Sequence, residues 1–479
     1  MEKYFSKLNW LLILIFDILS IGNLLALSNR NNFMNNLKSV KLFELENLKI
    51  DKDSKEYARE IINLKGVNEM ILFPDTHTKT KYVNANYKIT IPSSAVISSD
   101  LEYLYPQFRS RGINCGMTVV ALPFSEEDLK EKFVLKLFNS ILYSIPYYIN
   151  YRLRLATPFL SSKYDLSHKE FKGVLEGGAK AYAGFRNSNN NQLENFDFQG
   201  CFKNLKEINY AQYINKAWMD YRNIRLRNSF GRYYGGNHFF EIQVVNKVID
   251  NEKTNLKEGQ IVIVFHTAGE SLEDIIREDW RDKYIRSKNY KYIKKEDPAY
   301  QGFFFSQALA MNYGFAYRYA TVLMIDDLLK KYFGGDKNVD VILDKSHNFV
   351  TEEEIRGKQQ IIYRHNAEKI LPGGLALLSG FYNTFSYIVK GGEDLENSLY
   401  SMDHGYGKVI KDTMPGHELE NFVQIQRNKK GLKSSFFKKI RKEKIVFYKE
   451  VDEYFAVMKK NNLLTSSIEL RPIINMKFN

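Results

Sequence analysis

Gly235-Gly236-Asn237-His238-Phe239-Phe240-Glu241-Ile242 is the stretch that decides the fold. A tight turn from Tyr234 to Asn237 leads directly into a segment, His238 to Val245, in which apolar and polar residues alternate. Glycine permits the tight turn, and the alternation favours a β-strand. The imidazole of His238 is therefore predicted to lie where a strand begins.

Cys115 and two further histidines stand beside other predicted strands. Cys115 precedes a strand predicted at Thr118–Pro123. His266 follows one predicted at Gln260–Phe265, and His347 follows one predicted at Val339–Leu343. A fourth histidine opens the glycine-rich segment His404-Gly405-Tyr406-Gly407. One thiolate and several imidazoles are a ligand set for first-row transition metals. Ligands at strand ends, with helices between the strands, predict an α+β fold whose strands converge on one pocket.

The composition favours an intracellular protein with an anionic partner. A net charge of +13 and a pI of about 9.2 point to nucleic acid, the commonest such partner, although AT-rich genomes also raise the lysine content. Two distant cysteines provide no disulfide framework, which favours a reducing compartment. We expect a cytoplasmic monomer with one large domain, residues 37–479, because no linker or repeat divides the chain.

Residues 1–36 form an apolar extension with two open interpretations. Apolar runs cover Trp10–Phe16 and Ile18–Leu27, and Lys3 and Lys7 precede them. In the first interpretation, residues 10–27 are a targeting segment or a membrane tether, and the protein would be organelle-targeted or membrane-associated. Polar residues interrupt the runs, which favours instead an extra helix or a stretch upstream of a start near Met34.

Two basic stretches carry interleaved aromatic residues, Arg281–Lys295 and Arg427–Lys444. Cations neutralise phosphates, and tyrosine or phenylalanine rings can stack on bases. Each stretch alone fits a solvated charged face equally well.

Taken together, these segments resemble the RtcB family of RNA-joining ligases, in chain order from about Ser39 to the C-terminus. The opening stretch is close to the family's G-G-N-H-F-x-E-I and is the most specific match. The other matching segments are Pro74-Asp75-Thr76-His77, Asn114-Cys115-Gly116-Met117, Val174-Leu175-Glu176-Gly177-Gly178, Asn312-Tyr313-Gly314-Phe315-Ala316-Tyr317-Arg318, His347-Asn348, Ser401-Met402-Asp403-His404-Gly405-Tyr406-Gly407-Lys408, Phe447-Tyr448-Lys449 and Lys477.

The chain departs from the family pattern at several positions. Gly112 stands where the family has a metal-binding aspartate, and Glu270 and Lys408 stand where it has arginines. The family's R-K-G-A-T segment reads Arg364-His365-Asn366-Ala367-Glu368, and its guanosine loop P-G-S-M-G reads Ser379-Gly380-Phe381-Tyr382-Asn383. Weaker affinity for one metal ion is the expected consequence of Gly112.

The resemblance implies a single large RtcB-like domain, with mixed and antiparallel sheets around a central metal pocket, and assigns roles to residues. Two Mn²⁺ ions would be held by Cys115, His238, His266 and His347. His404 would be the nucleophile toward GTP, with Asp75 orienting its ring. GTP contacts would fall on Asn237, His238, Phe239, Phe240, Glu241, His347, Asn348, Ser379, Gly380, Phe381, Tyr382, Ser386, His404, Gly405, Tyr406, Gly407, Tyr448 and Lys477.

Two functions follow from the resemblance and stay open at this point. The first is a GTP- and Mn²⁺-dependent RNA ligase of tRNA splicing or RNA repair. It would join a 3′-phosphate or 2′,3′-cyclic phosphate to a 5′-hydroxyl through a histidine–GMP intermediate, with a protein activator as a further partner. The second is a degenerate relative that binds metal and RNA without joining ends, which the departures from the family pattern favour.

Overall fold

The computed structural model describes residues 38–46, 49–78, 91–128, 163–188, 190–213, 215, 224–227, 230, 238–250, 253–267, 269–280, 284, 291–334, 338–380, 384–407 and 452–476. The expectations for residues 1–36, Asn237, Phe381, Tyr382, Lys408, Arg427–Lys444, Tyr448 and Lys477 lie outside these ranges.

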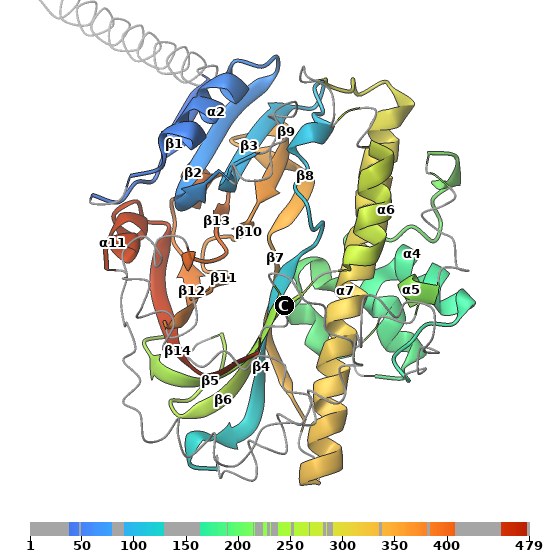
Figure 1. Cartoon of the computed structure of the whole chain (residues 1–479), viewed down its shortest axis with the longest axis vertical. Helices are drawn as coiled ribbons and strands as arrows, with labels where there is room; N and C mark the ends of the chain where they lie inside the picture. Colours follow the sequence, from blue (N-terminus) through green and yellow to red (C-terminus); the bar gives the residue numbers. More distant parts are fainter. Residues whose placement is uncertain are drawn as a thin grey trace, which may run out of the picture.

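Two large sheets dominate the described part of the chain (Figure 1). The first has the order β1-β2-β3-β9-β8, and the second β11-β12-β14-β5-β6-β4-β7. All their pairings are antiparallel except β1 with β2, and a two-stranded ladder joins β10 to β13. The strands are β1 Ser39–Leu42, β2 Val67–His77, β3 Ser93–Asp100, β4 Gly116–Ser125, β5 Phe239–Val248, β6 Gln260–Thr267, β7 Asp340–Ser346, β8 Asn348–Ile355, β9 Lys358–His365, β10 Ala367–Lys369, β11 Leu375–Leu378, β12 Ser386–Gly391, β13 Ser401–Asp403 and β14 Leu464–Met476.

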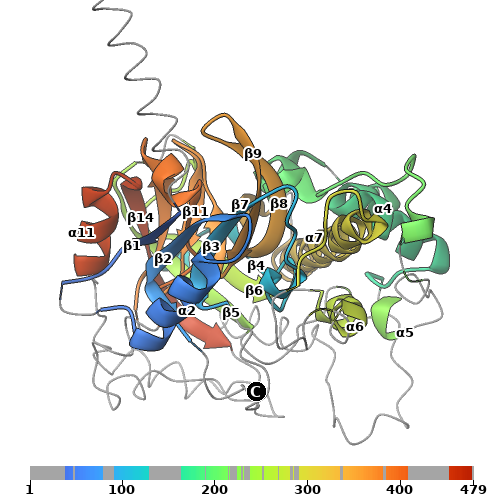
Figure 2. The same cartoon turned by 90° about the horizontal axis from the view of Figure 1, so that it is seen from above.

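Helices cover the sheets on two sides. The helix α11 lies beside β14, while α4 and α7 lie across the sheets from it (Figures 1 and 2). The helices are α2 Lys52–Ile62, α4 His168–Phe185, α5 Ile224–Arg227, α6 Glu270–Trp280, α7 Pro298–Phe333 and α11 Asp452–Lys460. The mixture of antiparallel sheets and packed helices makes the fold α+β, as the sequence predicts.

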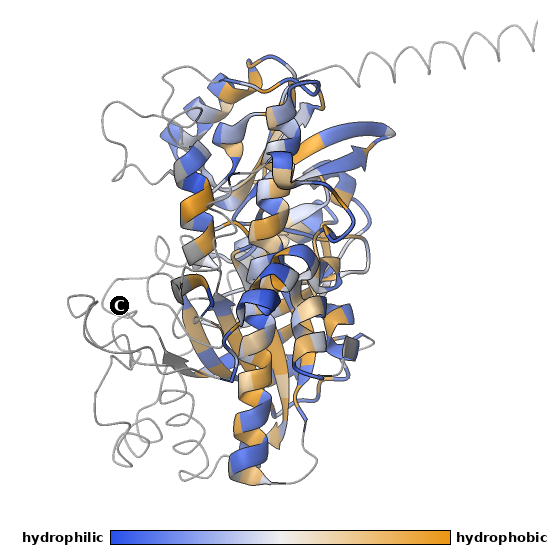
Figure 3. Ribbon diagram, turned by 90° about the vertical axis from the view of Figure 1, so that its right-hand side faces the viewer, coloured by the Kyte–Doolittle hydropathy of each residue, from blue (hydrophilic) through white to orange (hydrophobic). Residues whose placement is uncertain are grey.

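The long helix α7 packs against α4 and shares a hydrophobic core with strands of both sheets. Asp297 caps its first turn by accepting a hydrogen bond from the N–H of Ala299 at 2.8 Å, and Pro298 fits the first helical position. Gly334 ends the helix with φ +67°, a conformation that glycine adopts without strain. Hydrophobic residues run along most of this helix and the strands beside it, as a buried helix requires (Figure 3).

The predicted strands are present but longer than their apolar runs. Strand β2 extends well beyond its apolar run Met70–Phe73 and continues through Pro74 to His77. The pairing with β3 shifts register between Leu72 and His77, so the strand continues past the proline through an irregular segment. This segment carries Asp75 into the interior, where its side chain is buried.

The membrane-tether hypothesis concerns residues outside the described ranges. Among the helices that the structure describes, none combines the length and the apolar character needed to span a bilayer.

Candidate metal centre and nucleophile

Antiparallel pairing brings the predicted metal ligands together where four neighbouring strands of the second sheet begin or end. Neighbouring strands run in opposite directions, so the beginnings of β4 and β5 meet the ends of β6 and β7. Cys115 directly precedes β4, His238 precedes β5, and His347 follows β7. His266 lies near the end of β6, paired with Met117 and Phe239. Each ligand therefore owes its position to a strand terminus.

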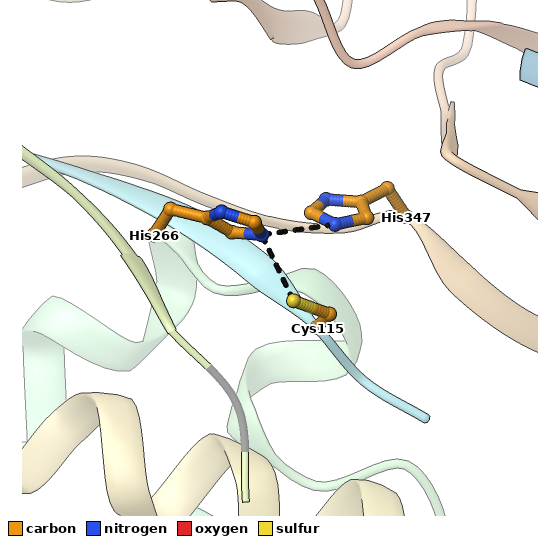
Figure 4. A group of neighbouring side chains, drawn as sticks. All are labelled: Cys115, His266 and His347. Atoms are coloured by element: carbon orange, nitrogen blue, oxygen red, sulfur yellow. Dashed lines mark hydrogen bonds between the residues drawn. The ribbon is translucent and has the colours of Figure 1, made fainter. Parts of the chain in front are cut away.

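The thiol and the imidazoles point toward one another (Figure 4). Cys115 Sγ lies 2.8 Å from His266 Nε2 and 3.6 Å from His238 Nε2. His266 Nε2 lies 3.2 Å from His347 Nε2. One donor atom each from Cys115, His266 and His347 falls within 4.8 Å of the others, and all three residues are buried. A buried soft sulfur with converging ring nitrogens fits a transition-metal ion chemically.

Burial keeps one of these imidazoles neutral. The pKa of His347 is lowered well below its ordinary value by burial, and then by the charges that His404 and His266 would carry. A neutral ring offers a lone pair, whereas an imidazolium offers none. His347 is therefore ready to bind a cation without first losing a proton.

A buried arginine fixes the backbone that carries Cys115. Asn114 adopts a left-handed conformation with φ +58°, and its N–H donates to the Asn348 carbonyl at 2.9 Å. Arg318 donates to the Asn114 carbonyl at 2.5 Å and to both oxygens of Asp344 at 2.6 and 2.7 Å. Arg318 and Asp344 are both fully buried, so the pair is shielded from screening and holds the turn firmly.

The glycine that departs from the family pattern lies directly beside the thiol. Gly112 has φ +70°, and its carbonyl accepts the Cys115 N–H at 2.7 Å. A Cβ added at Gly112 would lie 3.3 Å from Cys115 Cβ and 4.0 Å from Cys115 Sγ. A carboxylate at this position would thus reach the thiol cluster, and the absence of one leaves the cluster less negatively charged.

The candidate nucleophile His404 lies next to the cluster. Its ring centroid is 4.4 Å from that of His347. Its carbonyl accepts a hydrogen bond from the Ser379 N–H at 3.1 Å, and the Tyr406 N–H donates to the Ser379 carbonyl at 3.2 Å. These contacts join the His404–Tyr406 turn to the end of β11.

Several predicted nucleotide contacts belong to one hydrogen-bonded group that is linked to this turn. Ser386 Oγ accepts a hydrogen bond from the Gly380 N–H at 3.0 Å and lies 3.4 Å from Gln243 Nε2. The same Gln243 amide donates to the Glu241 carboxylate. Glu241, Ser386 and Gly380 thus form one hydrogen-bonded group, linked to the His404 turn through Ser379.

Other predicted contact residues serve packing or the backbone. Phe240 is buried and stacks on Phe265 at 5.9 Å, and the Tyr406 hydroxyl donates to the Phe385 carbonyl. Phe239 lies with its ring 5.5 Å from that of His266. Asn348 accepts the Asn366 N–H at 2.8 Å, and Gly405 pairs with Ser379.

The basic stretch at Arg281–Lys295 uses its described aromatic rings internally. Tyr284 is buried, and Tyr292 makes edge contacts with Tyr103 and Tyr105 at 4.9 and 5.9 Å. Both rings thus make contacts within the protein.

The fold and the site define the class first: an α+β protein with a buried thiol–imidazole cluster that could hold a metal ion, and with a histidine turn beside it. The sequence profile of the family described as "tRNA-splicing ligase RtcB" matches residues 58–478, so the chain belongs to this family. It is 24% identical to the tRNA-splicing ligase RtcB of Pyrobaculum aerophilum over 448 residues, 84% of this chain and 86% of that protein. It is 22% identical to the tRNA-splicing ligase RtcB of Archaeoglobus fulgidus, over 88% of this chain and 91% of that protein. It is 24% identical to the tRNA-splicing ligase RtcB of Nanoarchaeum equitans, over 88% of this chain and 90% of that protein.

Sequence reasoning missed two buried residues beside His404. Asp403 and Tyr454 are both fully buried, and the Tyr454 hydroxyl donates to Asp403 Oδ2 at 3.1 Å. A carboxylate in the motif segment was a signal that could have drawn attention to Asp403. Nothing in the sequence marks Tyr454, because its position depends on how α11 packs.

Proposed function

We propose that this protein is a GTP- and Mn²⁺-dependent RNA ligase that works through guanylylation of His404. The observation that carries the proposal is the convergence of Cys115, His238, His266 and His347, together with the His404 ring, whose centroid lies 4.4 Å from that of His347. Membership of a ligase family supports the same reaction class.

In this proposal Cys115, His238, His266 and His347 would hold two Mn²⁺ ions. Such ions withdraw charge from a pentavalent phosphorus and from a pyrophosphate leaving group. The protein's own contribution is to fix the ligands at strand ends, where they are buried and oriented before any ligand arrives.

His404 is the proposed nucleophile. A neutral ring nitrogen attacks the α-phosphorus of GTP and pyrophosphate leaves, which gives a phosphoramidate. The guanylate then passes to an RNA 3′-phosphate, and the 5′-hydroxyl of a second end displaces GMP. The net charge of +13 favours the approach of RNA. Asp75 is proposed to orient the His404 ring.

Glu241 is the proposed guanine reader. Its buried carboxylate is suited to accept hydrogen bonds from the N1 and N2 edge of guanine, which adenine lacks. Ser386 and the Ser379-Gly380 backbone lie in the same hydrogen-bonded group and would complete this contact. We propose a cytoplasmic, monomeric enzyme that uses tRNA halves or broken RNA ends as substrates.

Transfer of label from α-labelled GTP to the protein in the presence of Mn²⁺ tests the proposal. The wild type is expected to become labelled, and His404→Ala is expected to lose the label. His168→Ala, which removes an exposed histidine at the start of α4, is the matched control and should label normally. No label on the wild type, or equal label on His404→Ala, contradicts the proposal and favours the degenerate relative.

A further inference from the structure

Two buried aspartates, Asp75 and Asp403, are in contact next to His404 in the interior. Asp403 is fully buried, and Asp75 is 4% exposed. The backbone N–H of Asp75 lies 3.4 Å from Asp403 Oδ2 and donates to it. The two residues come from different sheets, Asp75 from β2 and Asp403 from β13. Their approach is therefore a feature of the tertiary fold rather than of local sequence.

Among the residues that the structure describes, the surroundings of Asp403 supply hydrogen-bond donors but no compensating cation. Its Oδ2 accepts from the Tyr454 hydroxyl at 3.1 Å, and Tyr454 is itself fully buried on α11. Within the described ranges, Asp403 forms no ion pair with lysine or arginine, and its Oδ1 has no hydrogen-bond partner. An ionised carboxylate in such a place would carry a large desolvation cost.

Two titratable side chains of the described part of the chain face the pair directly. Tyr454 faces Asp403 from α11, and His77 faces Asp75 with its Nδ1 4.0 Å from Asp75 Oδ2. Tyr406 lies behind Tyr454, with ring centroids 5.8 Å apart. Burial, and then the charge of Asp75, raise the pKa of Asp403 well above its ordinary range. Two carboxyl groups in one dry site cannot both ionise at low cost, so one of them keeps its proton.

Asp403 also fixes the chain next to His404. It pairs with Ala367 in the β10–β13 ladder, and Ala367 donates its N–H to the His347 carbonyl at 3.0 Å. The His404 N–H lies 3.4 Å from the Asn366 carbonyl. The Asp403 side chain anchors the last residue of β13 to α11 and β2, and this anchor sets where the next residue begins.

We propose that Asp403 is a protonated, neutral carboxyl group that positions the His404 turn, with Asp75 as the ionised member of the pair and Tyr454 as its hydrogen-bonding support. A neutral group anchors the turn without placing a second negative charge beside a site for an anionic triphosphate. The functional half of this inference rests on the proposed guanylylation of His404, whereas the protonation of Asp403 does not.

Infrared difference spectroscopy on the full-length protein at neutral pH tests the protonation. The spectrum of wild type minus Asp403→Asn is expected to contain the C=O stretch of a protonated carboxylic acid, shifted in heavy water. Asp394→Asn, which neutralises an exposed aspartate, is the matched control and should show only the bands of a lost carboxylate. The absence of a carboxylic-acid band for Asp403 would overturn the inference, whatever the labelling result.

The same variants in the GTP-labelling assay test the positioning. Asp403→Asn keeps a neutral group of the same shape and is expected to label within about threefold of wild type. Asp403→Ala loses the anchor and should label at least about tenfold more slowly, with Tyr454→Phe between the two. A folded Asp403→Asn protein that loses labelling as completely as Asp403→Ala refutes the positioning role. If the wild type takes no label, the proposed function fails, and the infrared band alone still decides the state of Asp403.

Discussion

Replacing Glu353 by glutamine should destabilise the protein by about 3 kcal/mol at neutral pH. Arg364 is fully buried and donates to both oxygens of Glu353, at 2.5 and 3.1 Å. Its other donors reach Ser401 Oγ at 2.8 Å and the Leu399 carbonyl at 3.1 Å, at the start of the strand that leads to His404. The Arg364–Glu353 pair therefore stabilises the chain just before the His404 turn.

The magnitude follows from the pKa of the carboxyl group. Burial alone would raise the pKa of Glu353, but Arg364, with further contributions from Lys369 and Thr351, outweighs it, and the pKa falls from its ordinary 4.5 to about 2. At about 1.36 kcal/mol per pKa unit, this difference corresponds to about 3 kcal/mol. A lowered pKa in the folded state stabilises the protein above pH 4.5, and this stabilisation is lost as the pH falls toward about 2.

Urea unfolding of wild type and Glu353→Gln across a pH series measures this difference. It should be about 3 kcal/mol at pH 7 and should shrink as the pH falls below the ordinary glutamate value. Glu354→Gln, the exposed neighbour on the same strand, should change stability by less than about 0.5 kcal/mol. A difference below about 1 kcal/mol at pH 7, or one that does not vary with pH, would refute the reasoning.

Three further predictions concern the site. Gly112→Asp places a carboxylate beside Cys115 Sγ and should tighten Mn²⁺ binding roughly tenfold in a titration, about 1.4 kcal/mol, whereas Gly112→Ala shares the positive-φ strain and should not tighten it. Glu241→Gln should reduce the preference for GTP over ATP in the labelling assay by about tenfold or more, and an unchanged preference would remove Glu241 as the guanine reader. The pKa of Asp403 is raised in the folded protein. The wild type should therefore lose stability relative to Asp403→Asn as the pH rises from the ordinary pKa of an aspartate toward the pKa of Asp403 in the folded state. Thermal unfolding measures this, and parallel pH profiles for the two proteins would contradict it.

The sequence predicts the placement of the ligands well because each stands at the end of a strand. Alternation and β-branched runs identify β4, β5, β6 and β7, and antiparallel pairing then brings His238, His266 and His347 to one edge with Cys115. The continuation of β2 to His77 is not predictable from the sequence, because proline usually ends a strand and the irregular pairing with β3 is a tertiary feature.

The buried contacts that hold the site residues in place are not predictable from local sequence patterns. Arg318 meets Asp344 across 26 positions of sequence, and Tyr454 meets Asp403 across 51. Contacts of this kind depend on how α7 and α11 pack against the sheets. In the sequence, Arg318 and Tyr454 look like ordinary polar residues on a helix, and nothing local indicates that they are buried or which aspartate they contact.

Binding of Mn²⁺ to the purified protein tests the central claim most directly. A titration followed by electron paramagnetic resonance should show tight binding to wild type, and Cys115→Ala and His266→Ala should weaken it at least about tenfold, or about 1.4 kcal/mol. Cys201→Ala removes the other free cysteine and should bind as wild type does. If Cys115→Ala and Cys201→Ala bind Mn²⁺ equally, the thiol–imidazole cluster is not a metal centre.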